Sequence, residues 1–286
     1  MDQAQGIRQM TSSQPVRVMA VTSGKGGVGK SNVAVNLAVS LAQNERRVMV
    51  MDADMGLANI DVLLGLSPKM NLSHVINGEC SLEDTIIEGP CGVKIIPASS
   101  GVSSMSDLTP AQNAGIIRSF SELTLAVDTL IIDTAAGLSD SVVSYTRAAR
   151  EVIIVVCDEP ASITDAYAMI KVMNRDYGIQ RFHVLSNQAR GPQQGRELYL
   201  KLARVSEKYL EVTLNFLGTV PYDEYLKKAV QKQKCVVECF PRSPSALAFK
   251  QIAKKTQSLP LPENMEGHLE FFIERLIDYS AQDNRL

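Results

Sequence analysis

A glycine-rich segment of eight residues constrains the fold of this chain more than any other feature. It reads Gly24-Lys25-Gly26-Gly27-Val28-Gly29-Lys30-Ser31 and fits the pattern G-x4-G-K-[ST] without a mismatch. An apolar run at 16–22 precedes it, and a helical pattern at 32–43 follows it. Glycines let successive backbone N–H groups turn inward around phosphate oxygens, and the helix adds its positive N-terminal end. The segment predicts a phosphate-binding loop in which Lys30 reaches the β- and γ-phosphates and Ser31 coordinates Mg²⁺.

Strand-like and helix-like segments alternate along the rest of the chain. Short runs rich in Val and Ile are typical of parallel strands that are buried on both faces. We expect strands at 16–22, 47–52, 93–97, 129–133, 151–157, 182–187 and 216–220. We expect helices at 32–43, 110–124, 139–149, 162–177, 191–210 and 244–256. This alternation predicts an α/β fold whose doubly wound, mostly parallel sheet is flanked by helices and binds ligands at the carboxyl ends of its strands.

The composition excludes several classes of protein. The 286 residues carry a formal net charge of −2, which disfavours a globally basic nucleic-acid binder. There is no run of 18 apolar residues and no basic, apolar leader at the N-terminus, so we expect a cytoplasmic protein without a membrane span. The five cysteines are scattered, as expected for reduced thiols. Cys235 and Cys239 are spaced CxxxC, which differs from the usual zinc spacing and argues against a metal site.

Acidic residues close two of the predicted strands, next to the expected phosphate loop. Asp52 and Asp54 follow one strand, and Asp133 ends the apolar run 130–133. Acids at the carboxyl ends of neighbouring strands hold metal-bound or attacking water. We expect Asp133 to accept a hydrogen bond from magnesium-bound water. An Asp that closes a strand can instead cap the next turn, and this alternative stays open for Asp52.

Lys25 is not needed in an ordinary phosphate loop, and its presence is informative. The loop matches K-G-G-x-G-K-[ST], residues 52–59 match D-x-D-x-G-x-x-N, and residues 130–137 have the Walker B form. Over residues 14–257 the chain resembles the MinD/ParA family of deviant Walker A ATPases, which are P-loop NTPases of the SIMIBI type. The resemblance implies a homodimer that sandwiches ATP, in which Lys25 contacts the phosphates of the opposite subunit, much as an arginine finger does.

The resemblance also assigns catalytic and metal-binding roles. Asp54 would orient the attacking water. Asp52 would support the Mg²⁺ shell and the lysine of the loop. The implied metal-binding residues are Ser31, Asp52 and Asp133. The implied catalytic residues are Lys25, Lys30 and Asp54.

Further residues are implied in binding the base. Asn187 would read the adenine edge, because an amide pairs with a donor and an acceptor of adenine together. Pro221 and Asp223 would close over the base, although a Pro-x-Asp segment also begins helices as a cap. The implied ATP-binding set is Gly24, Lys25, Gly26, Gly27, Val28, Gly29, Lys30, Ser31, Asn32, Asn187, Pro221 and Asp223.

Within the family, the chain resembles the flagellar-number regulators of the FlhG/FleN (YlxH-like) type. Residues 2–8 look like the D-Q-A-x-x-[LI]-R motif that activates the GTPase FlhF, with Asp2, Gln3 and Ala4 as contacts and a disordered terminus as the alternative. Two further segments look typical of this branch, 139–144 and 157–167. The resemblance implies control of flagellar number and placement by ATP-driven dimerisation. Its implied partners are FlhF, the C-ring proteins FliM and FliN, and the transcription activator FlrA or FleQ.

Two other functions on the same fold remain as alternatives. A ParA- or MinD-type ATPase for DNA segregation or septum positioning fits the loop. Residues 224–255, with eight bases against two acids, form either a basic patch or two solvated helix faces. We expect no direct nucleic-acid binding, because DNA segregation leaves the N-terminal motif without a role. An iron–sulfur carrier needs cysteines that bridge a cluster, and the loop after Asp133 has none.

The C-terminal segment has the pattern of an amphipathic helix. Its apolar residues recur at helical spacing, and the helix resembles the membrane-targeting helix of this branch. The side chains implied to enter lipid, reversibly at the inner membrane face or the cell pole, are Leu269, Phe271, Phe272, Leu276 and Ile277. Residues 263–286 carry six acids and two bases, which anionic lipids repel, so docking on the protein's own core is an equal alternative. We divide the chain into an N-terminal arm (1–14), an ATPase domain (15–258) and a C-terminal helix (259–286).

Overall fold

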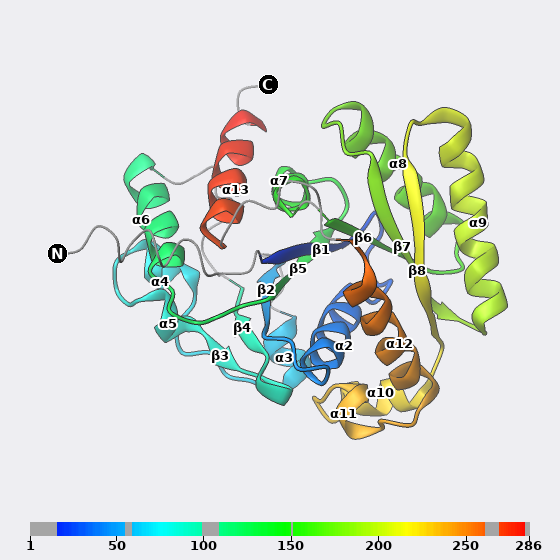
Figure 1. The fold of residues 1–286 in the computed structure, drawn as a ribbon, viewed down its shortest axis with the longest axis horizontal. Helices are drawn as coiled ribbons and strands as arrows, with labels where there is room; N and C mark the ends of the chain where they lie inside the picture. Colours follow the sequence, from blue (N-terminus) through cyan, green and yellow to red (C-terminus); the bar gives the residue numbers. More distant parts are fainter. Residues whose placement is uncertain (1–15, 55–58, 99–108, 150, 261–268, 284–286) are drawn as a thin grey trace.

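The computed structural model describes residues 16–54, 59–98, 109–149, 151–260 and 269–283. Within these ranges the chain forms an eight-stranded sheet with the order β3-β4-β2-β5-β1-β6-β7-β8 (Figure 1). Neighbouring strands run parallel, except that β3 and β4 are antiparallel. The strands are β1 (Arg17–Ser23), β2 (Val48–Ala53), β3 (Ile87–Glu88), β4 (Lys94–Ile96), β5 (Thr129–Ala136), β6 (Glu151–Val156), β7 (Arg181–Ala189) and β8 (Thr213–Pro221).

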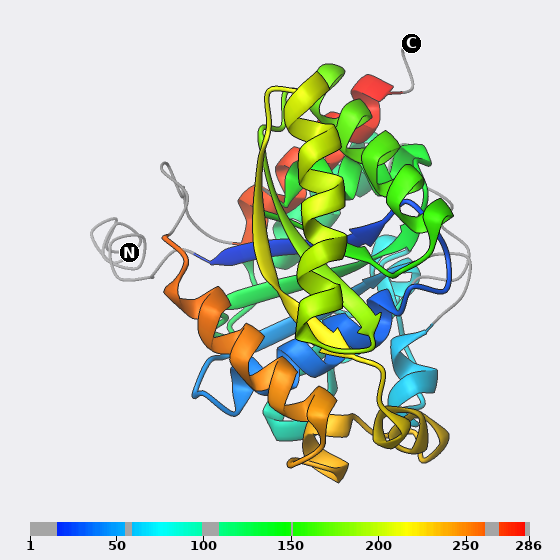
Figure 2. The ribbon, with the colours of Figure 1, turned by 90° about the vertical axis from the view of Figure 1, so that its right-hand side faces the viewer.

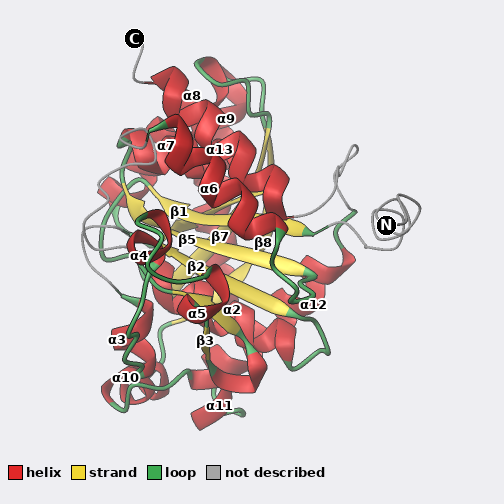
Figure 3. Cartoon of the chain, turned by 90° about the vertical axis from the view of Figure 1, so that its left-hand side faces the viewer, coloured by secondary structure: helices red, strands yellow, loops and turns green. Residues whose placement is uncertain are grey.

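Helices cover both faces of the sheet (Figure 3). One face packs against α2 (Lys30–Ala42), α3 (Ile60–Leu64), α10 (Glu224–Gln231), α11 (Val236–Cys239) and α12 (Pro244–Ser258). Each strand contributes side chains to both faces, because successive side chains along a strand point to opposite sides of the sheet. In β1, Met19 and Val21 belong to the core on the α2 side, whereas Val18 and Ala20 belong to the core on the other side.

The opposite face carries the remaining helices. They are α4 (Leu72–Ile76), α5 (Leu82–Thr85), α6 (Pro110–Ser121), α7 (Asp140–Ala148), α8 (Pro160–Arg175), α9 (Pro192–Tyr209) and α13 (Leu269–Asp283). A short 3-10 helix, Pro90–Gly92, precedes β4. No helix in the described ranges is long and apolar enough to cross a membrane.

The connections around β1 show which end of the sheet is expected to bind a ligand. β1 leads into α2 on one face, whereas its neighbours β5 and β6 lead into α7 and α8 on the other face. Ligands of open α/β sheets bind at the carboxyl ends of strands where the connections diverge in this way. The glycine-rich loop at 24–29 lies at this point.

The predicted fold class is confirmed, and every predicted strand and helix is present in the structure. The prediction missed β3, the short helices α3, α4, α5 and α11, and α10. Strand β3 has only two residues, and helices of four or five residues show too few turns for a periodic pattern. Strand β8 begins at Thr213, three residues before its predicted start at 216, because polar and exposed residues of an edge strand break the apolar run.

Candidate nucleotide-binding site

The glycine-rich loop has a backbone conformation and close neighbours that leave no room for side chains at some of its glycines. Gly27 and Gly29 adopt φ values of 79° and 90°, in the left-handed region that favours glycine. A Cβ atom on Gly24 would lie 2.3 Å from the backbone of Asp165 on α8. A Cβ atom on Gly29 would lie 2.5 Å from the Asn187 amide nitrogen. The loop therefore requires glycine at these positions, and it ends at the N-terminus of α2, where the helix dipole favours an anion.

Lys30, the first residue of α2, places a buried cation in this loop. Its side chain is 8% exposed and makes no hydrogen bond or ion pair with another described residue. Desolvation lowers the pKa of its ammonium group, while the nearby carboxylates of Asp133 and Asp54 oppose this shift. A buried ammonium without a direct partner is stabilised by an incoming anion, so the loop and Lys30 together fit a nucleotide phosphate.

Asp133 lies on β5, beside β1 and β2, in register with Val21 and Asp52. It is fully buried, and neither carboxylate oxygen has a hydrogen-bond partner within the described ranges. Desolvation raises its pKa to about 7; the nearby Ser31 hydroxyl and Lys30 ammonium oppose this rise, although the hydroxyl makes no well-aligned hydrogen bond. Two unused carboxylate oxygens next to a hydroxyl fit a hydrated Mg²⁺, which takes oxygen ligands.

Asp52 has a different environment from Asp133. One of its oxygens accepts the backbone N–H of Asp54 at 3.1 Å, and the other accepts those of Asn59 at 3.1 Å and Ile60 at 3.2 Å. Desolvation raises its pKa to about 6, although these three hydrogen bonds lower it. The carboxylate therefore holds the start of α3 against the end of β2, which is the capping role that the sequence left open. Its acceptors are occupied by the backbone, so Asp133 and Ser31 are the better direct metal site.

Asp54 follows the end of β2. Its carboxylate accepts a hydrogen bond from the Asn59 side chain at 3.1 Å, and its charge acts on Lys30. Residues 55–58 lie outside the described ranges. The structure thus places the predicted water-orienting acid on the Lys30 side of the loop, and its catalytic role remains a prediction.

Asn187 and Asp223 both contact protein groups in this structure. The Asn187 amide donates to the Val28 carbonyl at 2.8 Å and so braces the phosphate loop; its carbonyl oxygen is buried and has no partner among the described residues. Asp223 is the N-cap of α10, accepting from the Tyr225 N–H at 2.9 Å. Its second oxygen accepts the N–H and the hydroxyl of Ser245, at 2.9 and 2.6 Å. Asp223 thus has the capping geometry that the sequence left open, two residues after Pro221 at the end of β8.

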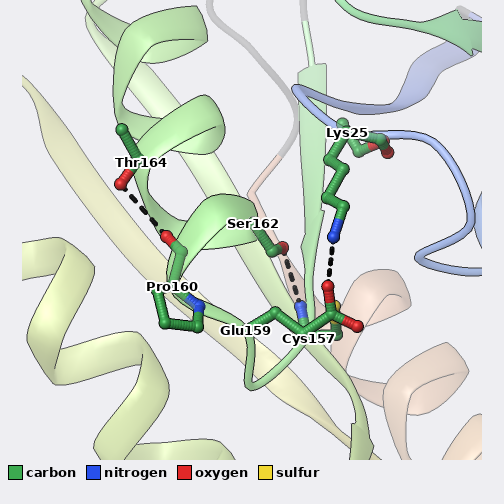
Figure 4. Close-up of polar contacts among 7 residues, drawn as sticks. Lys25, Cys157, Glu159, Pro160, Ser162 and Thr164 are labelled. Carbon is green, nitrogen blue, oxygen red and sulfur yellow. Dashed lines mark hydrogen bonds and ion pairs between the residues drawn. The ribbon is translucent and has the colours of Figure 1, made fainter.

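Lys25 pairs with Glu159, the residue before α8 (Figure 4). This hydrogen bond and the charge of Glu159 raise the pKa of Lys25. The turn that carries Glu159 is fixed locally, because the Ser162 hydroxyl accepts the N–H of Cys157 at 3.1 Å and the Glu159 N–H donates to the Cys157 carbonyl at 2.8 Å. Both charged side chains are accessible to solvent, so this pair is weak and can exchange.

Sequence reasoning missed Glu159 and Asp165 as site residues. Both lie in the segment 157–167, which was singled out as typical of one branch of the family, but without any contact assigned. Gly24 could have indicated a contact of this kind, because a glycine is often required where another backbone approaches closely, and here that backbone is Asp165. No signal in the sequence pairs Glu159 with Lys25 across 134 positions.

The apolar side of α13 faces the protein. Phe272, Ile273 and Leu276 are fully buried in the core formed with α6 and α7, and Ile277, 9% exposed, belongs to the same core. The Arg275 guanidinium donates to the Ala148 carbonyl at the end of α7, at 2.9 Å. In the structure, α13 therefore docks on the protein's own core, which is one of the two arrangements that the sequence left open. The side chains of Leu269 and Phe271 lie outside what the structure describes, as do Asp2, Gln3 and Ala4 of the N-terminal arm.

The basic segment 224–255 forms α10, α11 and most of α12. Some of its lysines contact aromatic rings: Lys227 lies over Tyr222, Lys228 over Tyr225 and Lys232 over Phe240. Cys235 and Cys239 lie at either end of α11, and no group of three possible metal ligands was found among the described residues.

A phosphate loop at the switch point of a parallel sheet, with an unpartnered lysine and a buried acid next to it, defines a P-loop nucleoside triphosphatase. The ParA family model, described as NUBPL iron-transfer P-loop NTPase, matches residues 14–257. The chain belongs to the ParA/MinD family of P-loop ATPases.

Two relatives cover nearly the whole chain. The antiactivator FleN of Pseudomonas aeruginosa is 58% identical over 275 residues, which cover 96% of this chain and 98% of that protein. The flagellum site-determining protein YlxH of Helicobacter pylori is 33% identical over 92% of this chain and 90% of its own length. The chain is thus similar to an antiactivator and to a flagellum site-determining protein along almost its full length.

Solved structures show the same fold. The cell-division ATPase MinD of Pyrococcus furiosus has a TM-score of 0.67 at 24% identity and covers 85% of this chain and 99% of its own. MinD of Pyrococcus horikoshii, solved with Mg-ADP, has a TM-score of 0.66 at 23% identity, with 85% and 96% covered. As a member of this family, the chain is an ATP hydrolase that uses ATP and Mg²⁺. Bound Mg²⁺ supplies charge stabilisation for the phosphates, and Ser31 and Asp133 are the residues that would hold it.

Proposed function

We propose that this chain is an ATP-switched antiactivator that limits the number and placement of flagella. The observation that carries the proposal is its 58% identity to the antiactivator FleN over 96% of this chain and 98% of that protein. The similarity to YlxH, a flagellum site-determining protein, supports the same process. The proposed partners are the GTPase FlhF, the C-ring proteins FliM and FliN, and the transcription activator FlrA or FleQ. The protein would act in the cytoplasm and reversibly at the membrane or cell pole.

In this proposal, ATP joins two copies of the chain into a dimer, and hydrolysis separates them. Lys30 binds the phosphates within one subunit, Ser31 and Asp133 hold Mg²⁺, and Asp54 orients the water. Lys25 completes the site of the opposite subunit. Its pairing with Glu159 supports this division of work, because the pair is exposed to solvent and weak enough to exchange when a second subunit binds. Hydrolysis is then slow in the monomer and faster in the dimer.

The number of flagella per cell tests the proposal. A strain that lacks the gene is expected to carry many flagella, and the wild-type gene is expected to restore the normal number. Lys30→Gln, expressed to the same level, is expected not to restore it. Arg204→Gln is the matched control, because Arg204 is an exposed residue of α9 and lies far along the chain from the loop. Normal flagella in the deletion strain, with misplaced septa or lost DNA, would instead assign the ATPase to the MinD or ParA type of function.

The membrane step is a separate part of the proposal. With Phe272 and Leu276 buried against the core, α13 has to leave its site before it can enter a lipid surface. We expect ATP-driven dimerisation to release it. Sedimentation with liposomes is then higher with ATP than with ADP. Equal sedimentation with both nucleotides would show that α13 acts as a fixed part of the core.

A further inference from the structure

A cavity of about 1050 Å³ lies at the opposite end of the sheet from the phosphate loop. Glu151, Arg181 and Thr213, the first residues of β6, β7 and β8, line it, whereas the phosphate loop follows the last residue of β1. Side chains of α9 and of the end of α12 complete its wall, and these helices lie on either side of β8 (Figure 2). The length of the strands therefore separates the cavity from the nucleotide site.

The cavity wall carries more positive than negative charge. Arg181, Arg196 and Lys255 line it, against the single acid Glu151. Glu151 is already paired with Arg17, at 3.3 Å. Arg181 and Arg196 are both exposed, and neither forms a hydrogen bond or ion pair with another residue in the described ranges. Two unengaged guanidinium groups at one cavity provide the paired donors that an oxyanion needs.

Two buried polar side chains on the same wall each have one polar atom without a hydrogen-bond partner among the described residues. His183 is 6% exposed and Glu151 is 7% exposed. The Nδ1 atom of His183 and the Oε2 atom of Glu151 make no hydrogen bond with any described residue. Buried polar atoms without partners are rare in folded proteins. Asn215 is the neighbour of His183 in the β7–β8 register and adds an amide to this wall.

The protonation state of His183 fits a hydroxyl-bearing ligand. Burial, together with the nearby charges of Arg17, Arg181 and Lys255, lowers its pKa to about 4. The imidazole is therefore neutral near pH 7 and has one donor and one acceptor nitrogen. A hydroxyl group both donates and accepts, so it matches the hydrogen-bonding capacity of such a ring.

Two aromatic rings form an apolar part of the wall. The rings of Tyr199 and Phe216 lie 5.1 Å apart, and the Tyr199 hydroxyl donates to the Leu214 carbonyl at 2.8 Å. This bond fixes the ring at the cavity edge. The combination of an apolar wall, a few polar groups and a volume of this size is typical of small-molecule sites.

The geometry points to a second ligand site in this cavity, for a small organic phosphate whose body carries hydroxyl groups. Arg181 and Arg196 bind the phosphate. His183, Asn215 and Glu151 bind the hydroxyl groups. The inference goes beyond the proposed function, because it adds a small-molecule input that is separate from ATP.

Binding of ribose 5-phosphate to the full chain tests the site, with Mg-ADP in excess so that the phosphate loop is filled. Calorimetry is expected to show binding in the micromolar to low millimolar range. The double variant Arg181→Gln, Arg196→Gln is expected to weaken it about tenfold or more, since both guanidinium contacts are lost. Arg204→Gln, an exposed arginine of the same helix α9 that does not line the cavity, is expected to bind as the wild type does.

An independent readout uses the imidazole resonances of the chain's three histidines. Assigned with His74→Gln and His268→Gln variants, the His183 signal is expected to move with ribose 5-phosphate while the His74 signal stays. Absence of binding up to about 10 mM would overturn the inference, as would equal binding by the double variant. Equal affinity for inorganic phosphate and ribose 5-phosphate would overturn the claim that the site recognises the hydroxyl-bearing body of the ligand. Movement of all histidine signals together would show a general effect instead of a site.

Discussion

The two ends of the central sheet carry charged groups of similar kinds but organise them differently. At the carboxyl end, Lys30 stands in a loop whose glycine backbone sets the geometry, next to Asp133 on β5. At the amino end, Arg181 and Arg196 come from β7 and α9, and neither is fixed by a partner among the described residues. The first end is organised around one contiguous motif, to which neighbouring strands add residues such as Asp133, whereas the second exists only because distant segments assemble. This difference decides which site a sequence reveals and how strongly each site depends on a single residue.

The largest expected effect is at the carboxyl end. Lys30→Gln removes the buried cation that the phosphates meet, so ATP affinity is expected to fall by about two to three orders of magnitude. The nucleotide-free protein is expected to keep its stability, because the ammonium has no direct partner to lose. Calorimetric titration with Mg-ATP and thermal unfolding without nucleotide measure the two effects. Arg196→Gln, at the amino end, serves as control and is expected to bind ATP normally; equal loss in both variants would contradict the separation of the two ends.

A second prediction separates metal binding from nucleotide binding at the same end. Asp133→Asn keeps the shape but removes the negative charge, so ATP binding in the presence of Mg²⁺ is expected to weaken about tenfold to a hundredfold. Binding of ATP with excess chelator is expected to change little, because Lys30 and the loop backbone remain. Titrations with and without Mg²⁺ give this comparison. An equal loss in both conditions would mean that Asp133 supports the loop itself.

At the amino end, the expected effect is on stability and depends on pH. The pKa of His183 is about 4 in the folded protein and about 6.5 when exposed, so below pH 6.5 the unfolded chain binds a proton that the folded chain does not. Stability is therefore lost as the pH falls from 6.5 towards 4, by about 2 kcal/mol between pH 7.5 and pH 5. Denaturant unfolding of the wild type and of His183→Gln across this range measures it. The variant is expected to lack this part of the slope, and parallel pH profiles would contradict the assignment.

The smallest effect is expected from Glu159→Gln. The ion pair with Lys25 is exposed, so its loss is expected to change the thermal unfolding midpoint by only about 1 °C. ATP-dependent dimerisation is expected to shift by no more than about threefold. Light scattering across an ATP titration measures the shift. A much larger loss would give Glu159 a direct role in the dimer beyond holding Lys25.

The sequence predicted the fold class because buried parallel strands leave long apolar runs and the loop leaves a contiguous motif. The phosphate loop, Lys30 and Asp133 were predicted for the same reason, since their positions follow from a strand, a turn and a helix. The predicted roles of Asp52 and Asp223 were less specific. Both side chains accept backbone N–H groups at a helix start, and an acid that caps and an acid that binds metal follow a strand in the same way.

What the sequence did not predict depends on contacts between distant segments. Glu159 meets Lys25 from a turn after β6, and the cavity joins residues from Glu151 to Pro260. The apolar spacing of α13 predicted a helix with one apolar side, but lipid and protein select the same spacing. Only the packing of Phe272 and Leu276 against α6 and α7 distinguishes docking on the core from an exposed apolar side.

The central claim is that the carboxyl end of the sheet is half of a site that ATP completes with a second copy. Light scattering of Asp54→Ala tests it most directly, because a protein that binds ATP without hydrolysing it is expected to accumulate as the dimer. We expect the mass to double from 31.2 kDa when ATP and Mg²⁺ are added, and to stay at 31.2 kDa when Lys30→Gln is combined with Asp54→Ala. A monomeric Asp54→Ala protein that binds ATP would contradict the claim.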